Sequence, residues 1–156
     1  MEVKLVRIGI EDAQKLWNMQ VRSFQELFEK YQDTETSPAV EKINKIIMRL
    51  NQSFTYYYFI EADNILAGAI RVVDKHEKDK AKRISPIFIM PEYRNKGLAQ
   101  KAIQLVEEKH GNSDWELDTI LQEKGNCHLY EKMGYHQTGK TEMINEKMTL
   151  VFYKKD

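Results

Sequence analysis

The sequence is poor in the features that mark several common protein classes. It has one cysteine, Cys127, among 156 residues, which excludes an internal disulfide framework and suits a reducing compartment. No apolar run approaches the roughly 20 residues that cross a bilayer. The first residues, Met1–Lys4, also lack the apolar core of a signal peptide. We therefore expect a cytoplasmic protein that does not bind membranes.

An excess of charge of either sign is also absent. Lys and Arg total 24, Asp and Glu total 24, and the formal net charge is zero. Proteins that bind nucleic acid usually carry a net positive charge, so no nucleic-acid partner is expected. The four histidines and Cys127 show no zinc-ligand spacing, and neither the P-loop nor the Rossmann glycine pattern occurs. We therefore expect no metal and no nucleotide site of those two kinds.

The hydrophobic periodicity predicts an α/β (α+β) protein of one domain, residues 1–156. A spacing of 3.6 residues, caps and breakers predict helices at Glu11–Tyr31, Pro38–Leu50, Gly97–His110 and Asn126–Lys132. Apolar and β-branched runs predict strands at Val3–Ile8, Phe54–Ile60, Ile65–Val73, Ile84–Met90, Trp115–Ile120, Tyr135–Thr141 and Lys147–Tyr153. This order of elements predicts a mixed sheet with helices on both faces.

The strand Ile84–Met90 contains Pro86, which cannot donate a hydrogen bond to a neighbouring strand. We therefore expect a bulge or an unpaired edge there. Directly after this strand comes a loop that leads into a helix, with the sequence Pro-Glu-Tyr-Arg-Asn-Lys-Gly-Leu-Ala at 91–99. A helix start carries unpaired N–H groups and a partial positive charge, so it binds phosphate. Arg94 and Lys96 would add side-chain charge.

The pattern Arg94-x-x-Gly97-x-Ala99 after a strand resembles the acyl-CoA loop of the GNAT superfamily of N-acyltransferases. A second block, Asn126–Tyr135, resembles that family's segment of Asn, short helix, Tyr-Glu-Lys and Gly-aromatic. The resemblance implies a mostly antiparallel sheet of six to seven strands that splays after the fourth. It also implies acetyl-CoA (coenzyme A) as co-substrate and acetyl transfer to a primary amine by direct attack in a ternary complex.

The resemblance also implies roles for particular residues. The cofactor-binding set would be the loop residues and the strand before them, together with one amide: Ile87, Phe88, Ile89, Arg94, Asn95, Lys96, Gly97, Leu98, Ala99, Gln100 and Asn126. Asn126 could equally serve as a helix N-cap. Tyr130 matches the position where the family commonly has a Tyr as general acid. A phenol suits this role, because it and an aliphatic thiol lose their protons in a similar pH range. Tyr130 could instead be a core side chain of a small amphipathic helix.

The general base is open at this stage. Glu116 and Asp118 lie two residues apart on one strand, so their side chains share a face, and either could take a proton from the amine or simply face solvent. Candidates for the acceptor pocket are Tyr31, Tyr56 and Tyr58.

The region near Tyr31 is acidic, with Glu26, Glu29, Asp33 and Glu35. It could attract a cationic small-molecule amine or simply be a solvated helix face. A protein lysine or N-terminus as acceptor, and a non-catalytic acyl-CoA-binding module, are the alternatives. Dimers occur in the family, so a homodimer also stays open.

Overall fold

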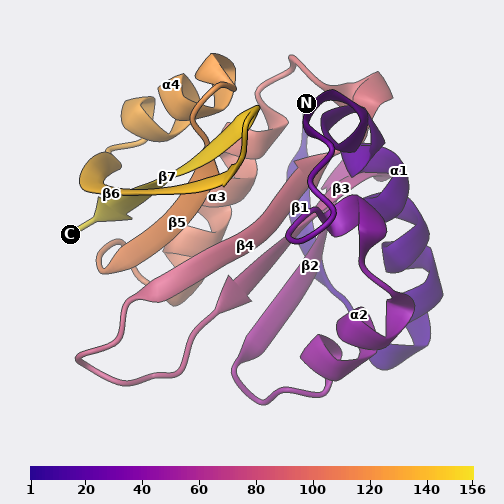
Figure 1. Ribbon diagram of the computed structural model, residues 1–156. Helices are drawn as coiled ribbons and strands as arrows, with labels where there is room; N and C mark the ends of the chain where they lie inside the picture. The colour runs from indigo at the N-terminus through magenta and orange to yellow at the C-terminus, as the bar shows by residue number, and fades with distance from the viewer.

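A seven-stranded sheet in the order β1-β2-β3-β4-β5-β7-β6 forms the centre of the protein in the computed structural model, which describes residues 1–156 (Figure 1). All neighbouring strands are antiparallel except β4 and β5, which are parallel. The strands are β1 (Val3–Arg7), β2 (Thr55–Ala62), β3 (Ile65–Val73), β4 (Lys82–Ile89), β5 (Trp115–Ile120), β6 (His136–Asn145) and β7 (Met148–Lys155). The predicted fold class is confirmed.

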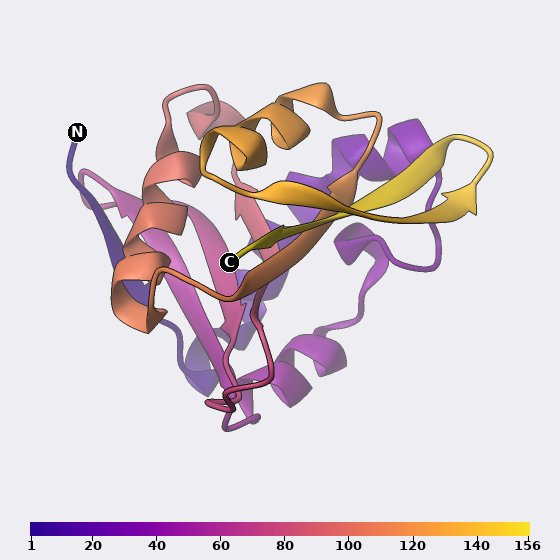
Figure 2. The same ribbon diagram turned by 90° about the vertical axis from the view of Figure 1, so that its left-hand side faces the viewer.

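Four helices cover the two faces of the sheet (Figure 2). They are α1 (Ala13–Tyr31), α2 (Ile43–Leu50), α3 (Leu98–His110) and α4 (Lys124–Lys132). Leu16 of α1 and Ile46 of α2 pack with Phe59 and Phe88 on one face. Residues of α3 and α4 pack with alternate residues of the same strands on the other face. None of the helices is both long and apolar enough to cross a bilayer.

The predicted helix Pro38–Leu50 is wrong in its first turn. Ser37 does cap a turn, because its Oγ accepts a hydrogen bond from the N–H of Ala39 at 3.1 Å. That turn is a 3-10 turn, Pro38–Val40, and the backbone is extended at Glu41 before α2 begins at Ile43. Contacts from α1 hold Glu41 extended, because the Trp17 indole donates to its carbonyl oxygen at 2.8 Å. Tertiary hydrogen bonds therefore override the local helical pattern.

The strand that contains Pro86 carries the predicted bulge. Ile70 of β3 pairs with Ile87, but Val72 pairs with Ile84, so β4 has one residue more than β3 in this interval. Ser85 and Pro86 together lie opposite a single residue, Arg71. The strand then separates from β5, to which it pairs only through Lys82 and Arg83. Beyond Arg83 the edge of β4 on the β5 side has no partner strand.

Gly68 of β3 allows β4 to approach closely beside this bulge. A Cβ atom at position 68 would lie 2.1 Å from the carbonyl oxygen of Phe88. Gly68→Ala should therefore lower the free energy of unfolding by roughly 1–3 kcal/mol, the cost of overpacking a close contact. Urea unfolding followed by circular dichroism measures this change.

The matched control is Gly125→Ala in the first turn of α4, where no atom lies within 4 Å of the added Cβ. That variant should be neutral or slightly more stable, because Ala has the higher helix propensity. Equal stability of the two variants would contradict the close approach at Gly68.

Candidate functional site

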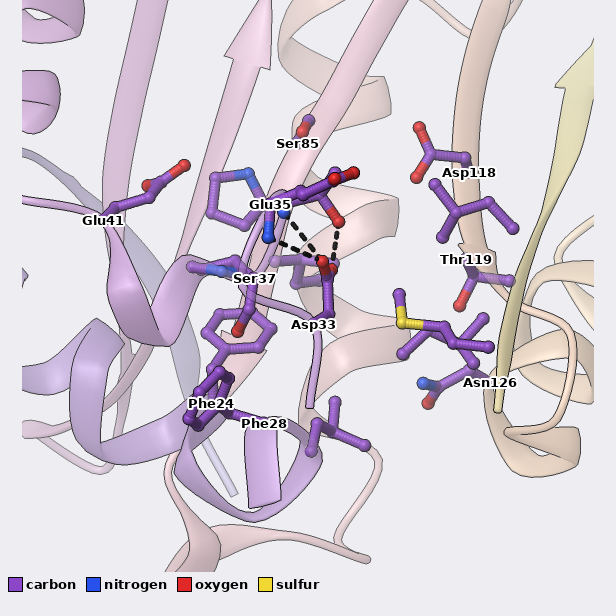
Figure 3. A pocket seen from close by; sticks show the side chains of 18 of the residues that line it. Phe24, Phe28, Asp33, Glu35, Ser37, Glu41, Ser85, Asp118, Thr119 and Asn126 are labelled. Carbon is purple, nitrogen blue, oxygen red and sulfur yellow. Dashed lines mark hydrogen bonds between the residues drawn. The ribbon is translucent and has the colours of Figure 1, made fainter. Parts of the chain in front are cut away.

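A cavity of about 420 Å³ lies where β4 and β5 separate (Figure 3). One wall comes from the second half of α1, the α1–α2 connection and α2, and the other from β5, α4 and β7. Residues of the β4 bulge lie between the two walls. The lining residues that the argument uses are Phe24, Phe28, Glu35, Glu41, Arg49, Ser85, Ile87, Asp118, Asn126 and Tyr130. The cavity exists because the parallel pairing of β4 and β5 stops after two residue pairs.

Four carboxylates and two cationic side chains line this cavity, and three of the carboxylates, Asp33, Glu41 and Asp118, have partners within the protein. Asp33 is buried and accepts hydrogen bonds from the N–H groups of Glu35 and Thr36 at 3.0 and 2.9 Å. Glu41 forms a two-pronged ion pair with Arg49, at 3.0 and 3.1 Å. These two acids stabilise the connection between α1 and α2. Glu35 and Asp118 reach into the cavity from opposite walls (Figure 3).

The two acids of β5 share a face, as their spacing predicts, but only one lines the cavity. Asp118 lies in the cavity, whereas Glu116 lines a separate hollow of about 250 Å³. Arg83 forms ion pairs with both, and its contact with Glu116 is 3.7 Å. Arg83 therefore restrains the Asp118 carboxylate at the edge of the cavity.

Tyr130 comes from α4 and lies at the inner end of the cavity, with 7% of its surface exposed. Its ring packs between Tyr135 and Tyr153, each 6.2 Å away between ring centres. Burial raises the pKa of Tyr130 well above its ordinary value, and the charge of Asp118 raises this pKa further. The phenol is therefore protonated over the whole neutral range and can act as a proton donor.

Asn126 lines the same cavity from the first turn of α4. The helix begins at Lys124, two residues earlier than predicted, and its N-cap is Glu123. The alternative role of Asn126 as the N-cap is therefore wrong. Its exposed side chain is free to contact a bound molecule.

The loop before α3 presents a run of unpaired backbone donors. None of the six N–H groups from Asn95 to Gln100 donates a hydrogen bond within the protein backbone. Asn95 and Gly97 have left-handed backbone conformations, with φ of 64° and 76°. Leu98 anchors the helix start, because its side chain is buried against Ala62 and Ala67. The arrangement matches a phosphate-binding helix N-terminus.

Arg94 faces the protein interior and contacts carbonyl oxygens there. Its Nε donates to the carbonyl oxygen of Ile89 at 2.9 Å, and a terminal nitrogen donates to that of Ser23 at 2.8 Å. The guanidinium also lies 3.7 Å from the carboxylate of Glu26. These contacts join the loop to α1. The role of Arg94 in cofactor binding stays a prediction.

Between the bulge and the loop, β4 turns alternate backbone groups toward its free edge. Met90 donates its N–H to the carbonyl oxygen of Ala67 at 2.7 Å. Since the ladder alternates, the N–H groups of Ile87 and Ile89 point away from β3, toward the gap beside β5. Phe88 anchors the strand, with its side chain buried against α1.

The structure does not bring the three acceptor candidates Tyr31, Tyr56 and Tyr58 to the cavity. The hydroxyl of Tyr31 donates to the carboxylate of Glu123 and so links α1 to α4. Tyr56 and Tyr58 lie on the α3 side of the sheet, with hydroxyls bonded to His76 and His110 at 2.8 and 2.9 Å. Strand alternation explains their position, because Tyr57 between them faces the α1 side.

Sequence reasoning missed the apolar lining of the cavity. The missed part comes from the second half of α1 and from β7, and consists of Phe24, Leu27, Phe28, Met148 and Leu150. The spacing 24, 27 and 28 places the first three on one helix face, which is a readable signal. The part played by β7 depends on the sheet order and has no local signal. No group of three or more His, Cys, Asp or Glu side chains could hold a metal ion.

Comparison with known proteins identifies one family. The profile of the acetyltransferase (GNAT) family matches residues 13–135. The spermidine N-acetyltransferase of Vibrio cholerae, solved with CoA and spermine, superposes with a TM-score of 0.76 at 16% identity, over 97% of this chain and 93% of that one. The ribosomal-protein-S18-alanine N-acetyltransferase of Escherichia coli gives 0.74 at 10% identity, over 97% and 92%.

The microcin C7 self-immunity acetyltransferase, solved with acetyl-CoA and AMP, gives a TM-score of 0.73 at 16% identity, over 97% of this chain and 91% of that one. At these identities the superpositions establish a shared fold, and the neighbours include enzymes for small molecules and for proteins.

Proposed function

The chain belongs to the GNAT family of acetyltransferases, and we propose that it transfers an acetyl group from acetyl-CoA to a small primary amine. The amine attacks the thioester directly in a ternary complex, and no enzyme-bound acetyl intermediate forms. The observation that carries this proposal is the convergence of Asp118, Glu35 and Tyr130 on one cavity beside the free edge of β4. An acceptor, its counter-charge and a proton donor can therefore meet at a single point.

Successive parts of acetyl-CoA, from the pyrophosphate to the thioester, each have a group of residues in this chain that suits them. The unpaired N–H groups from Asn95 to Gln100, at the positive end of α3, suit the pyrophosphate. The outward N–H groups of Ile87 and Ile89 suit the amide-bearing arm, which would add like a strand to the free edge of β4. The N–H of Ile89 would also polarise the thioester carbonyl. Asn126, across the cavity, can donate to the same arm.

Two groups transfer protons, one from the attacking amine and one to the leaving thiolate. An alkylammonium must lose a proton before it attacks, and Asp118 accepts this proton directly or through one water. Glu116 lies outside the cavity, so the assignment rests on Asp118 alone. Tyr130 returns a proton to the leaving thiolate. Burial disfavours the charged form of both phenol and thiol, so their relative acidities stay close in the same apolar surroundings.

The charges of the cavity support a cationic acceptor. The Glu35 carboxylate has no partner within the protein, and Asp118, which is paired with Arg83, also reaches into the cavity. Opposite charge raises the local concentration of a small cation. Spermine, bound in the Vibrio neighbour, is a cationic amine, whereas the Escherichia neighbour is named for an alanine of ribosomal protein S18. A panel of polyamines, monoamines and peptides, assayed by thiol release, separates the two classes.

A first prediction concerns the anchoring loop. Ala99→Pro removes one unpaired N–H from the second position of α3, where proline is compatible with the helix. The affinity for CoA should fall about 10- to 100-fold, because a hydrogen bond to a charged group contributes about 1.5–3 kcal/mol. Titration calorimetry measures this loss. Ala99→Ser keeps the N–H and should bind CoA like the original chain; unchanged affinity in Ala99→Pro would remove this amide from the phosphate site.

Tyr130→Phe tests the proton donor. The change removes the hydroxyl and keeps the ring packed between Tyr135 and Tyr153, so kcat should fall about 10²-fold or more, the usual contribution of general acid–base catalysis. The affinity for CoA should stay the same. Steady-state kinetics and calorimetry on one preparation give both values. A variant with unchanged kcat would exclude Tyr130 from the mechanism.

Glu35→Gln tests the acceptor side. Loss of the one cavity carboxylate without a partner in the protein should raise KM for a cationic amine about tenfold, with KM for acetyl-CoA unchanged, since a charge-assisted contact contributes about 1.5 kcal/mol or more. The matched control is Glu29→Gln on the exposed side of α1, outside the cavity. Equal effects of the two variants would show a general field of the acidic surface, and no effect of either would count against a cationic acceptor.

A further inference from the structure

The bulge of β4 faces one residue of the neighbouring strand. Ser85 and Pro86 lie opposite Arg71, between the pairs Ile70 with Ile87 and Val72 with Ile84. A bulge removes one residue from the regular ladder and leaves its backbone groups in need of other partners. The guanidinium of Arg71 supplies one, because it donates to the carbonyl oxygen of Ser85 at 2.8 Å.

Arg71 is unusual because it is a buried cation with no acid partner. Its residue is 9% exposed, and no carboxylate lies within ion-pairing distance of its guanidinium. The other terminal nitrogen donates to the neutral side chains of Gln52 and Thr55, each at 3.3 Å, and its Nε is unpartnered. Burial, together with the nearby charge of Arg49, lowers the pKa of Arg71 to about 10.

A buried charge of this kind costs free energy that its neutral partners do not fully return. Stability alone would favour an apolar side chain of similar length at this position. What an apolar side chain could not supply is the hydrogen bond that Arg71 donates to the carbonyl oxygen of Ser85 in the bulge. Since Ser85 lines the acceptor cavity and Ile87 follows two residues later, this contact lies at the start of the free edge of β4.

We propose that Arg71 is a positioning residue for acetyl transfer, which holds the bulge so that the N–H groups of Ile87 and Ile89 face acetyl-CoA. The extra residue in β4 determines which way these groups point. If the register before the bulge continued, Ile87 would lie opposite Ala69 and its N–H would point toward β3. Arg71 thus acts through the backbone of β4 and does not contact the reacting atoms.

The inference rests on the proposed use of the β4 edge by acetyl-CoA, so its test begins with a measurement that needs no substrate. In Arg71→Met, which keeps the length and apolar stem, hydrogen exchange at residues 84–90 should become at least tenfold faster. Exchange in α3 and β7 should stay the same. The intact, unliganded chain is labelled, and mass spectrometry of its peptides measures the exchange in each segment. The free energy of unfolding should stay the same or rise, because the buried charge has been removed.

Kinetics then test the consequence for the reaction. In Arg71→Met, kcat/KM for acetyl-CoA should fall about 10- to 100-fold, as expected for misplacement of a bound group, while KM for the amine stays constant. Arg71→Lys keeps a donor toward Ser85 and should recover most of the activity. The control Gln52→Ala removes a different partner of Arg71 and should match the original chain in exchange and kinetics.

Three outcomes would overturn the positioning role. One is unchanged exchange at residues 84–90 in Arg71→Met. A second is faster exchange with unchanged kcat/KM for acetyl-CoA, which would leave Arg71 holding the bulge and would count against the proposed use of this edge. The third is a loss of stability together with normal kinetics, which is the behaviour of a purely structural residue.

Discussion

The separation of β4 from β5 is the constraint on which the site depends. Two parallel strands that remained paired would satisfy their own backbone groups and leave no space between them. Here the pairing ends after Lys82 and Arg83, and the bulge at Ser85 and Pro86 follows at once. A free strand edge inside a sheet leaves N–H groups without a partner strand. In the proposed complex, the amide groups of acetyl-CoA would supply partners for this edge.

The two halves of the site use different chemistry. The side toward the co-substrate is built from backbone groups, on β4 and at the start of α3, whose positions depend on a glycine, a bulge and a buried leucine more than on polar side chains. The acceptor side is built from side chains of α1, α2, β5 and β7. Backbone donors tolerate almost any sequence, whereas side chains do not. Two proteins that share this fold at 16% and 10% identity carry different acceptors in their names, spermidine and the alanine of ribosomal protein S18.

Local chemistry explains which parts were predictable from the sequence. The turn at Asp63 and Asn64 has positive φ at both residues, Pro86 lies in its bulge, and Gly97 precedes α3. Each of these features depends on one or two residues. The extended backbone at Glu41 depends on side chains of α1, more than twenty residues away. Tyr56 and Tyr58 show a second kind of limit. The sequence shows that they lie on the opposite face of the strand from Tyr57, but it does not show which face of the sheet borders the cavity.

Burial and partners distinguish the acids that the sequence presents as one group. Asp33 and Glu35 are two residues apart in the same acidic connection. The first is buried and accepts two backbone hydrogen bonds, whereas the second is exposed and reaches toward Asp118. A count of charges gives both the same weight. The hydrogen bonds that Asp33 accepts from the backbone of Glu35 and Thr36 fix the turn. Asp33 therefore positions the backbone from which the Glu35 side chain extends toward the cavity. The electrostatics of the acceptor side therefore depend on the fold of the connection as well as on its composition.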